Sequence, residues 1–190
     1  ELKALQRPPW SQVRWIDDLD EMLRDPTIVA ILSEGKNEES LGQTEEIVDS
    51  GKHVFYDKPA GDGYPQFERI VSKACEKGLL IQLGYMFRYH DGFQRIAEFV
   101  HSGFLGRVFS VRARMATLKP DEGVRTRIGV HRGGILYDLA GHMLDQIVWL
   151  LGRPDKVTSY LRHDDEPVSN FSDNTLGVFE FENAMAMVDI

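Results

Sequence analysis

The sequence predicts an α/β fold followed by an α+β part, with a parallel sheet first and then a mostly antiparallel sheet that has one open face. Two observations predict this order. Short apolar runs alternate with helical segments through the first half, and this alternation is typical of right-handed crossovers in a parallel sheet. The second half places one long apolar helix among segments of alternating polarity, which is typical of strands with one covered face.

In the first half, strands and helices are expected in turn. The run TIVAIL at 27–32 is continuously apolar and rich in β-branched residues, so we expect a strand covered on both faces. The pair Asp17-Asp18 supplies an N-cap for a helix at 19–24, and Gly51 and Gly78 are expected to end the two longer helices. The expected strands are 13–16, 27–32, 53–56 and 79–83, and the expected helices are 19–24, 39–50 and 65–77.

The pattern changes in the second half. The segment 133–152 opens with two glycines, ends at Gly152 before Pro154, and carries apolar residues at helical spacing, so it predicts one buried helix. A long polar stretch, 117–132, precedes it and is interpreted as a loop that lines a pocket. The other expected elements are a helix at 92–102 and strands at 107–116, 156–162, 175–181 and 184–190.

The chain therefore divides into two predicted domains. The alternation of strands and helices in residues 1–90 is interpreted as part of a dinucleotide-binding, Rossmann-type domain. The sequence contains no G-x-G-x-x-G turn, so this part is expected to be the second half of that domain. Residues 91–190 are interpreted as a substrate and oligomerisation domain, and a homodimer or homotetramer through the open sheet face is expected. Both ends of the chain look incomplete, since the partial sheet would expose a long apolar edge and the last hairpin stops at Ile190.

Composition narrows the class of partner. The net charge of −8 argues against nucleic acid and against an anionic membrane surface. No apolar run approaches the roughly 20 residues that cross a bilayer. The single cysteine, Cys75, forms no internal disulfide and is expected to be a small buried residue. A cytoplasmic location is the default expectation, and an exported form stays open because the chain begins at Glu1 rather than at Met.

Asp138 and His142 are the first candidates for chemistry. They lie four residues apart in the long helix and therefore share one face, with Asp145 a step further along. A carboxylate beside an imidazole on a buried helix is costly unless the two are paired or used. A satisfied core pair and a catalytic pair are both open interpretations. A third metal ligand is not evident beside them, so no metal site is predicted.

Three polar segments follow the expected parallel strands at their carboxyl ends, where such sheets bind ligands: 33–37, 57–59 and 84–90. Lys58 sits at such an end, and Pro59 restricts its backbone, so it is either a ligand contact or a solvated surface lysine. Arg88 lies among aromatic residues and suits an anionic or planar ligand, or stacking on the surface. His131, in the loop before the long helix, is either a surface residue or a pocket residue.

Three stretches in this order resemble motifs of the Gfo/Idh/MocA oxidoreductases, the glucose–fructose oxidoreductase and inositol dehydrogenase group. They are GKHVFYDKPAG, then LGYMFRYH with SGFLGRV, and then GGILYDLAGHMLDQIVWLLG. The resemblance implies that Lys58 touches substrate and nicotinamide, that Asp138 orients the substrate and that His142 is the catalytic base. It also implies NAD or NADP as cofactor. Together with the positions at the strand ends and in the loop before the long helix, this gives Ser33, Asp57, Lys58 and Arg88 as the expected cofactor-binding residues. The expected substrate-binding residues are Lys58, His131, Asp138 and His142.

The resemblance implies hydride transfer from a secondary alcohol of a sugar, a polyol or a related cyclic substrate. Histidine titrates near neutral pH and suits the removal of the hydroxyl proton, while a lysine suits binding of the developing alkoxide. Two alternatives remain: an NAD-dependent glycoside hydrolase or lyase that oxidises the ring transiently, and a non-catalytic ligand-sensing or regulatory homologue. Asp57, Glu34 and Met86 depart from the usual Glu, Pro and Asn of the family, which bears on cofactor affinity.

Overall fold

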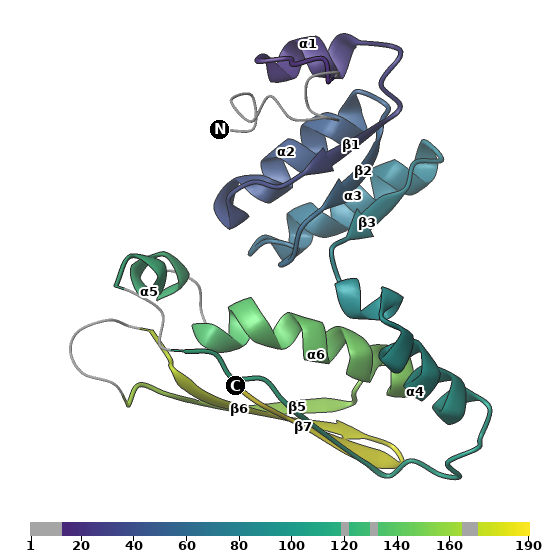
Figure 1. Cartoon of the computed structure of the whole chain (residues 1–190), viewed down its shortest axis with the longest axis vertical. Coiled ribbons are helices and arrows are strands. Elements are labelled where there is room, and N and C mark those ends of the chain that lie inside the picture. Colours follow the sequence, from purple (N-terminus) through teal and green to yellow (C-terminus); the bar gives the residue numbers. More distant parts are fainter. Residues whose placement is uncertain (1–12, 119–121, 130–132, 165–170) are drawn as a thin grey trace. The chain divides into compact units, whose positions relative to one another are not determined.

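The computed structural model describes residues 13–118, 122–129, 133–164 and 171–190. It forms two compact units, of which the first ends at Leu83 and the second begins at Gly84. The first unit holds a three-stranded parallel sheet in the order β1-β2-β3 (Figure 1). Its strands are β1 (Ala30–Ser33), β2 (His53–Tyr56) and β3 (Ile81–Leu83), and its helices are α1 (Leu19–Arg24), α2 (Asn37–Asp49) and α3 (Tyr64–Glu76).

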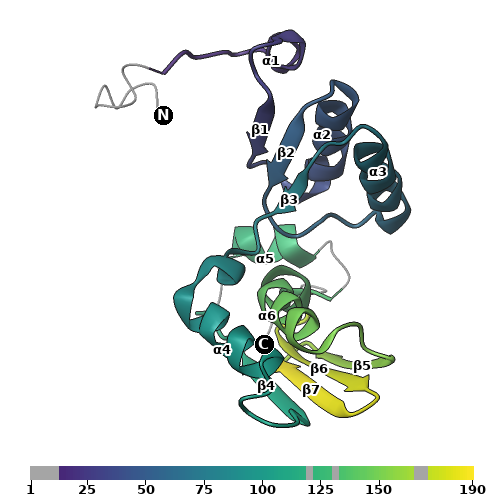
Figure 2. The same ribbon diagram turned by 90° about the vertical axis from the view of Figure 1, so that its right-hand side faces the viewer.

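One face of this sheet carries the core of the first unit. α2 and α3 lie side by side on that face (Figure 2). Their apolar residues recur one helical turn apart, which places them on the same side of each helix. The buried core consists of Ile31, Leu41, Ile47, Val48, Val54, Tyr56, Ile70 and Ala74. The predicted Rossmann-type partial sheet is therefore confirmed.

The opposite face of the sheet corrects the prediction for residues 27–32. Leu32 is 77% exposed and Ala30, on the same side of the strand, is exposed as well, so among the described residues β1 is covered on one face only. The strand also begins later than predicted, at Ala30. Asp25 accounts for this, because its carboxylate accepts hydrogen bonds from both the backbone N–H and the hydroxyl of Thr27 and closes a turn there.

Two further expectations in the first unit are wrong. Residues 13–16 form no strand. Arg14 instead donates hydrogen bonds to Glu21 and Asp25, at 2.8 and 3.0 Å, and this ties the segment to α1. Cys75 is exposed rather than buried, because Ala74 occupies the core-facing position of α3 and the next residue turns about 100° away.

The second unit contains a four-stranded sheet in the order β4-β7-β6-β5. The pairs β5–β6 and β6–β7 are antiparallel and the pair β4–β7 is parallel, so the predicted mostly antiparallel sheet is confirmed. The strands are β4 (Ser110–Arg114), β5 (Lys156–Arg162), β6 (Asn174–Phe181) and β7 (Ala184–Asp189). The helices are the 3₁₀ helix η3 (Met86–Tyr89), α4 (Asp91–His101), α5 (Glu122–Gly129) and α6 (Ile135–Leu151).

α6 lies across one face of this sheet (Figure 1). Its side of the core, Ala140, Met143 and Ile147, packs against a row from β6 and β7. That row consists of Phe179, Ala186 and Val188. The residues between them on the strands point the other way, and Tyr160 on β5 is 58% exposed. Among the described residues, the sheet therefore has the one open face that was predicted.

Glycine opens α6 for a physical reason. Gly134 has a φ of +50°, and a Cβ added there would lie 2.6 Å from the carbonyl oxygen of Ser172. The same carbonyl accepts a hydrogen bond from the N–H of Ile135 at 3.0 Å. The start of α6 is thus fixed against the chain that leads into β6.

No helix of the described residues is long and apolar enough to cross a membrane.

Candidate functional site

In the first unit, the candidate residues Ser33, Asp57 and Lys58 come together at the carboxyl edge of the sheet. Ser33 is the last residue of β1 and lies opposite Tyr56 of β2, and the N–H of Asp57 donates to its carbonyl oxygen at 3.2 Å. All three side chains are half-buried. The hydroxyl of Ser33 also donates to Oε1 of Gln43 on α2, at 3.1 Å. The parallel pairing brings these three residues to one edge, as the sequence predicted.

The loop after β2 is packed rather than loose. Pro59, which follows Lys58 through a cis peptide bond, is buried. Gly61 has a φ of +97°, and a Cβ there would lie 2.6 Å from Cγ of Leu41, so the loop lies directly on α2. The hydroxyl of Tyr56 donates to the carbonyl oxygen of Ala60 at 3.4 Å. These contacts fix the backbone that carries Lys58 at the edge of the sheet.

In the second unit, Asp138 and His142 lie on α6 with the predicted four-residue spacing. Asp138 is half-buried, and His142 is 8% exposed. Two aromatic rings from the segment before α4 lie against the imidazole. The ring centre of Phe87 is 5.1 Å away and that of Tyr85 is 6.2 Å away, the latter edge-on at 84°. The imidazole of His142 is therefore buried beside aromatic rings, on a helix whose start is held by backbone contacts.

Arg88 belongs to η3 and packs against α6 close to His142. Its Nε donates to both carboxylate oxygens of Asp145, at 3.0 and 2.8 Å, and its Nη2 donates to Oδ1 at 2.8 Å. The guanidinium carbon lies 5.4 Å from the ring centre of Trp149. These hydrogen bonds raise the pKa of Arg88. Burial raises the pKa of the Tyr85 phenol, and the charge of Asp145 raises it further.

Asp145 is the residue that sequence reasoning left without a role. The signal for it was its position three residues after His142, on the same side of the helix. Its partner lies 57 residues earlier in the chain, so spacing could not identify the pair. His131, which was predicted to bind substrate, lies outside the described residues. Among the residues that the structure describes, no group of acidic, histidine or cysteine side chains is arranged to hold a metal ion.

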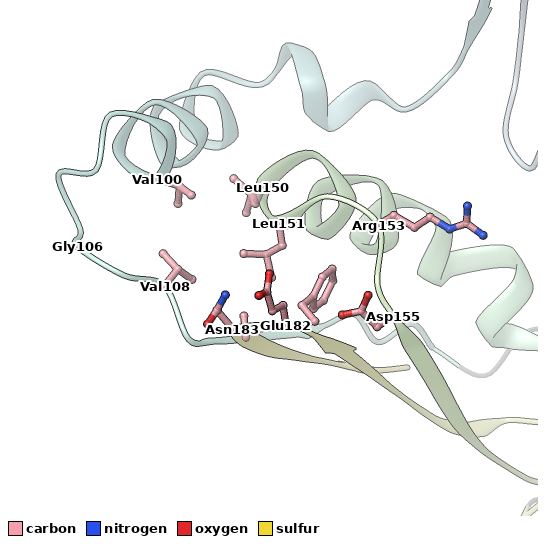
Figure 3. Close-up of a pocket in the computed structure, with 11 residues that line it drawn as sticks. Val100, Gly106, Val108, Leu150, Leu151, Arg153, Asp155, Glu182 and Asn183 are labelled. Atoms are coloured by element: carbon pink, nitrogen blue, oxygen red, sulfur yellow. The ribbon is translucent and has the colours of Figure 1, made fainter.

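A hollow of about 440 Å³ lies at the carboxyl end of α6, in the second unit. Figure 3 shows Val100, Val108 and Leu150 facing into it, while Arg153 extends away from it. Glu182 and Asn183 from the β6–β7 turn form part of its rim. None of the predicted site residues lines this hollow, so it is separate from the face of α6 that carries Asp138 and His142.

Comparison with known proteins adds a family. Residues 93–190 match the model of the GFO/IDH/MocA C-terminal domain. The chain is 28% identical over 157 residues to the uncharacterized oxidoreductase YhhX of Escherichia coli, an alignment that covers 83% of this chain and 45% of that protein. It is 27% identical over 145 residues to the NADP-dependent scyllo-inositol 2-dehydrogenase IolW of Bacillus subtilis, covering 76% and 40%. The chain thus spans less than half the length of these relatives.

Solved structures agree on the fold. The scyllo-inositol dehydrogenase of Lactobacillus casei, solved with NAD(H) and scyllo-inositol, superposes with a TM-score of 0.76 at 25% identity. The alignment covers 91% of this chain and 53% of that one. GenD2 from gentamicin A biosynthesis, solved with NAD, superposes with a TM-score of 0.83 at 25% identity, covering 94% and 52%. Both alignments include residues from each of the two units.

Proposed function

The chain belongs to the Gfo/Idh/MocA family of oxidoreductases, and from this premise we propose that it serves an NAD(P)-dependent oxidation of a secondary alcohol. The substrate class that we propose is a sugar, a polyol or a related cyclic compound. The observation that carries the proposal is the carboxylate and imidazole of Asp138 and His142, four residues apart on α6, within the part of the chain that the family model covers. The names of the scyllo-inositol dehydrogenases among its relatives support the substrate class.

The first unit offers groups that fit a nicotinamide nucleotide. At the edge of its sheet, Ser33 supplies a hydroxyl, Asp57 a carboxylate and Lys58 an ammonium group. Ribose hydroxyls and a carboxamide need this mixture of donors and acceptors, and ligands of parallel sheets bind at the carboxyl ends of the strands. When bound, NAD or NADP would supply the hydride acceptor. We assign Ser33, Asp57 and Lys58 to holding it.

The chain's own residues then have separate tasks. His142 accepts the proton of the substrate hydroxyl, because a histidine is neutral at physiological pH often enough to act as a base. Asp138, on the same face of α6, orients the imidazole or the substrate and stabilises the positive charge that forms. Lys58 donates a hydrogen bond to the substrate oxygen as negative charge develops there. His131 is proposed to contact the substrate as well.

Turnover of a defined substrate panel tests this proposal. The purified protein is incubated with sugars and polyols and with NAD or NADP, and reduced nicotinamide is followed by its absorbance. Steady formation of NADH or NADPH with one member of the panel is the expected result. Release of free sugar from a glycoside with no net reduction of the cofactor would point to the hydrolase or lyase chemistry instead. Binding of the cofactor without any turnover would favour a non-catalytic, ligand-sensing homologue.

We also propose a homodimer or homotetramer that forms through the open face of the second sheet. Direct cross-strand pairing places Val178 beside Met187 and Leu176 near Tyr160 on that face, with Arg112 at its edge. Val178→Glu would bury a charge in such an interface and is expected to give monomers in analytical ultracentrifugation.

A cytoplasmic location is part of the same proposal, and fractionation of cells that produce the protein checks it.

A further inference from the structure

Arg88 and Asp145 form an ion pair to which the proposed function assigns no task. Asp145 follows His142 by three residues on α6, so the two side chains leave the helix on adjoining sides. Arg88 belongs to η3, a separate segment, and reaches Asp145 with three hydrogen bonds of 2.8 to 3.0 Å. The guanidinium also lies over Trp149, one turn further along α6. Arg88 is thus fixed on two consecutive turns of one helix.

The pair is rigid for energetic reasons. The side chain of Asp145 is 9% exposed, and a carboxylate so far from water is costly unless it is paired and hydrogen-bonded. The planar guanidinium meets the carboxylate through two parallel bonds, a geometry that fixes orientation as well as distance. Gln94 of α4 donates to the carbonyl oxygen of Arg88 at 3.0 Å, so the backbone of η3 is held from a second helix.

The segment held in this way carries the two aromatic rings that lie beside His142. Tyr85 and Phe87 flank the imidazole, and Phe87 is itself stacked on Phe93 of α4 at 4.7 Å between ring centres. Tyr85 also lies close to α6 itself, since a Cβ added at Gly141 would be in ordinary van der Waals contact with Cε1 of Tyr85, at 3.5 Å. Arg88 is the charged residue of η3, and its ion pair with Asp145 ties the segment that carries Tyr85 and Phe87 to the helix that carries His142.

We propose that Arg88 and Asp145 are positioning residues that hold Tyr85 and Phe87 against His142 and so fix the orientation of its imidazole. This inference rests on the proposed role of His142 as the base of the reaction. It gives Arg88 a task different from the contact with the cofactor that its position in the sequence predicted. The two tasks make different predictions, because a cofactor contact acts on cofactor affinity and a positioning residue acts on turnover.

The spectroscopic test needs no turnover. The carbon-bound imidazole proton of His142 is displaced by the ring currents of Tyr85 and Phe87, and its NMR signal is identified as the one lost in His142→Gln among the six histidines. Arg88→Gln leaves a buried carboxylate unpaired and risks unfolding. The double variant Arg88→Met with Asp145→Leu avoids this, since an apolar pair of similar size replaces a buried ion pair at little cost in stability. We expect the His142 signal to move toward its position in an unstructured peptide in this double variant.

A matched control is available in the second unit. Arg162 meets Asp164 with the same forked geometry, at 3.1 Å from Nε to both oxygens, but Arg162 is 71% exposed and the pair lies at the end of β5. Arg162→Gln is expected to leave the His142 signal unchanged. In the active enzyme, the double variant is expected to lower kcat about 100-fold while the Kd of NAD(P) stays within twofold, as for a misplaced catalytic group.

Each result decides the inference. An unmoved His142 signal in a folded Arg88→Met, Asp145→Leu variant overturns it, and so does a loss of cofactor affinity with kcat unchanged. Either result leaves the proposed function standing. Unchanged turnover in His142→Ala would instead remove the proposed function, whatever the NMR signals show, so the two failures are distinguishable.

Discussion

The guanidinium of Arg88 donates to both carboxylate oxygens of Asp145, and this pair joins the segment before α4 to the helix that carries His142. The carboxylate is nearly buried and the arginine is 38% exposed. The pair therefore has one desolvated partner and one that still meets water. Its energetic weight lies in the cost of leaving Asp145 alone rather than in the attraction between the charges.

We expect Asp145→Asn to lower the free energy of unfolding of the second unit by about 1–3 kcal/mol, because two charge-assisted hydrogen bonds are lost and the rest weakened. Urea denaturation followed by circular dichroism measures this loss. Arg162→Gln is the control, since an exposed forked pair contributes only about 0–1 kcal/mol. Equal losses in the two variants would contradict the distinction between a buried and an exposed pair.

Tyr85 is expected to make the second unit less stable at alkaline pH. Burial, and then the charge of Asp145, raise the pKa of its phenol, so the folded state keeps the proton at a pH where the unfolded chain releases it. This contribution to stability is complete below the unfolded pKa of about 10 and is lost as the pH rises through the higher folded pKa. Tyr85→Phe is expected to flatten the fall in unfolding free energy above that pH. An identical fall in both proteins would show that Tyr85 does not cause it.

Gly42, inside α2, and Gly134, the residue before α6, are expected to respond in opposite directions to substitution by alanine. Gly42 lies inside α2 with no atom within 4 Å of an added Cβ, so Gly42→Ala should stabilise the first unit by about 0.5–1 kcal/mol. Gly134→Ala should destabilise the second unit by at least about 1–2 kcal/mol, because φ is +50° and the Cβ meets Ser172. Denaturant midpoints of the two variants provide the measurement. A gain in stability for Gly134→Ala would be inconsistent with this start of α6.

Local signals in the sequence predicted much of the fold. The bounds of α1, β2 and β5 were predicted to the residue, and Asp18 caps α1 by accepting from the N–H of Asp20. Each of these elements has a capping residue, a turn or a β-branched run next to it. α5 was missed, because it is short, polar and without an apolar period inside the stretch 117–132.

Long-range relationships could not be predicted in the same way. The apolar run around β1 indicated a buried strand, but a run of residues does not say which faces other elements cover, and Leu32 is exposed. Arg88 was recognised as a candidate, while its partner Asp145 depends on tertiary contact across 57 residues. The placement of Asp138 and His142 on one helix was predicted correctly, because it depends only on the local sequence of that helix. The roles of Lys58, Asp138 and His142 stay predictions.

The most direct test of the account is the rate of cofactor reduction by Lys58→Ala, His142→Ala and the double variant, on whichever sugar or polyol the unmodified protein oxidises. Circular dichroism first establishes that each variant is folded. We predict that each single variant loses about 10²–10⁴-fold in kcat. The double variant is expected to have a kcat only slightly below that of the less active single variant, because the effects of groups that serve one transition state do not add. A rate close to that of the unmodified protein in either single variant would contradict the roles assigned to the lysine and the histidine.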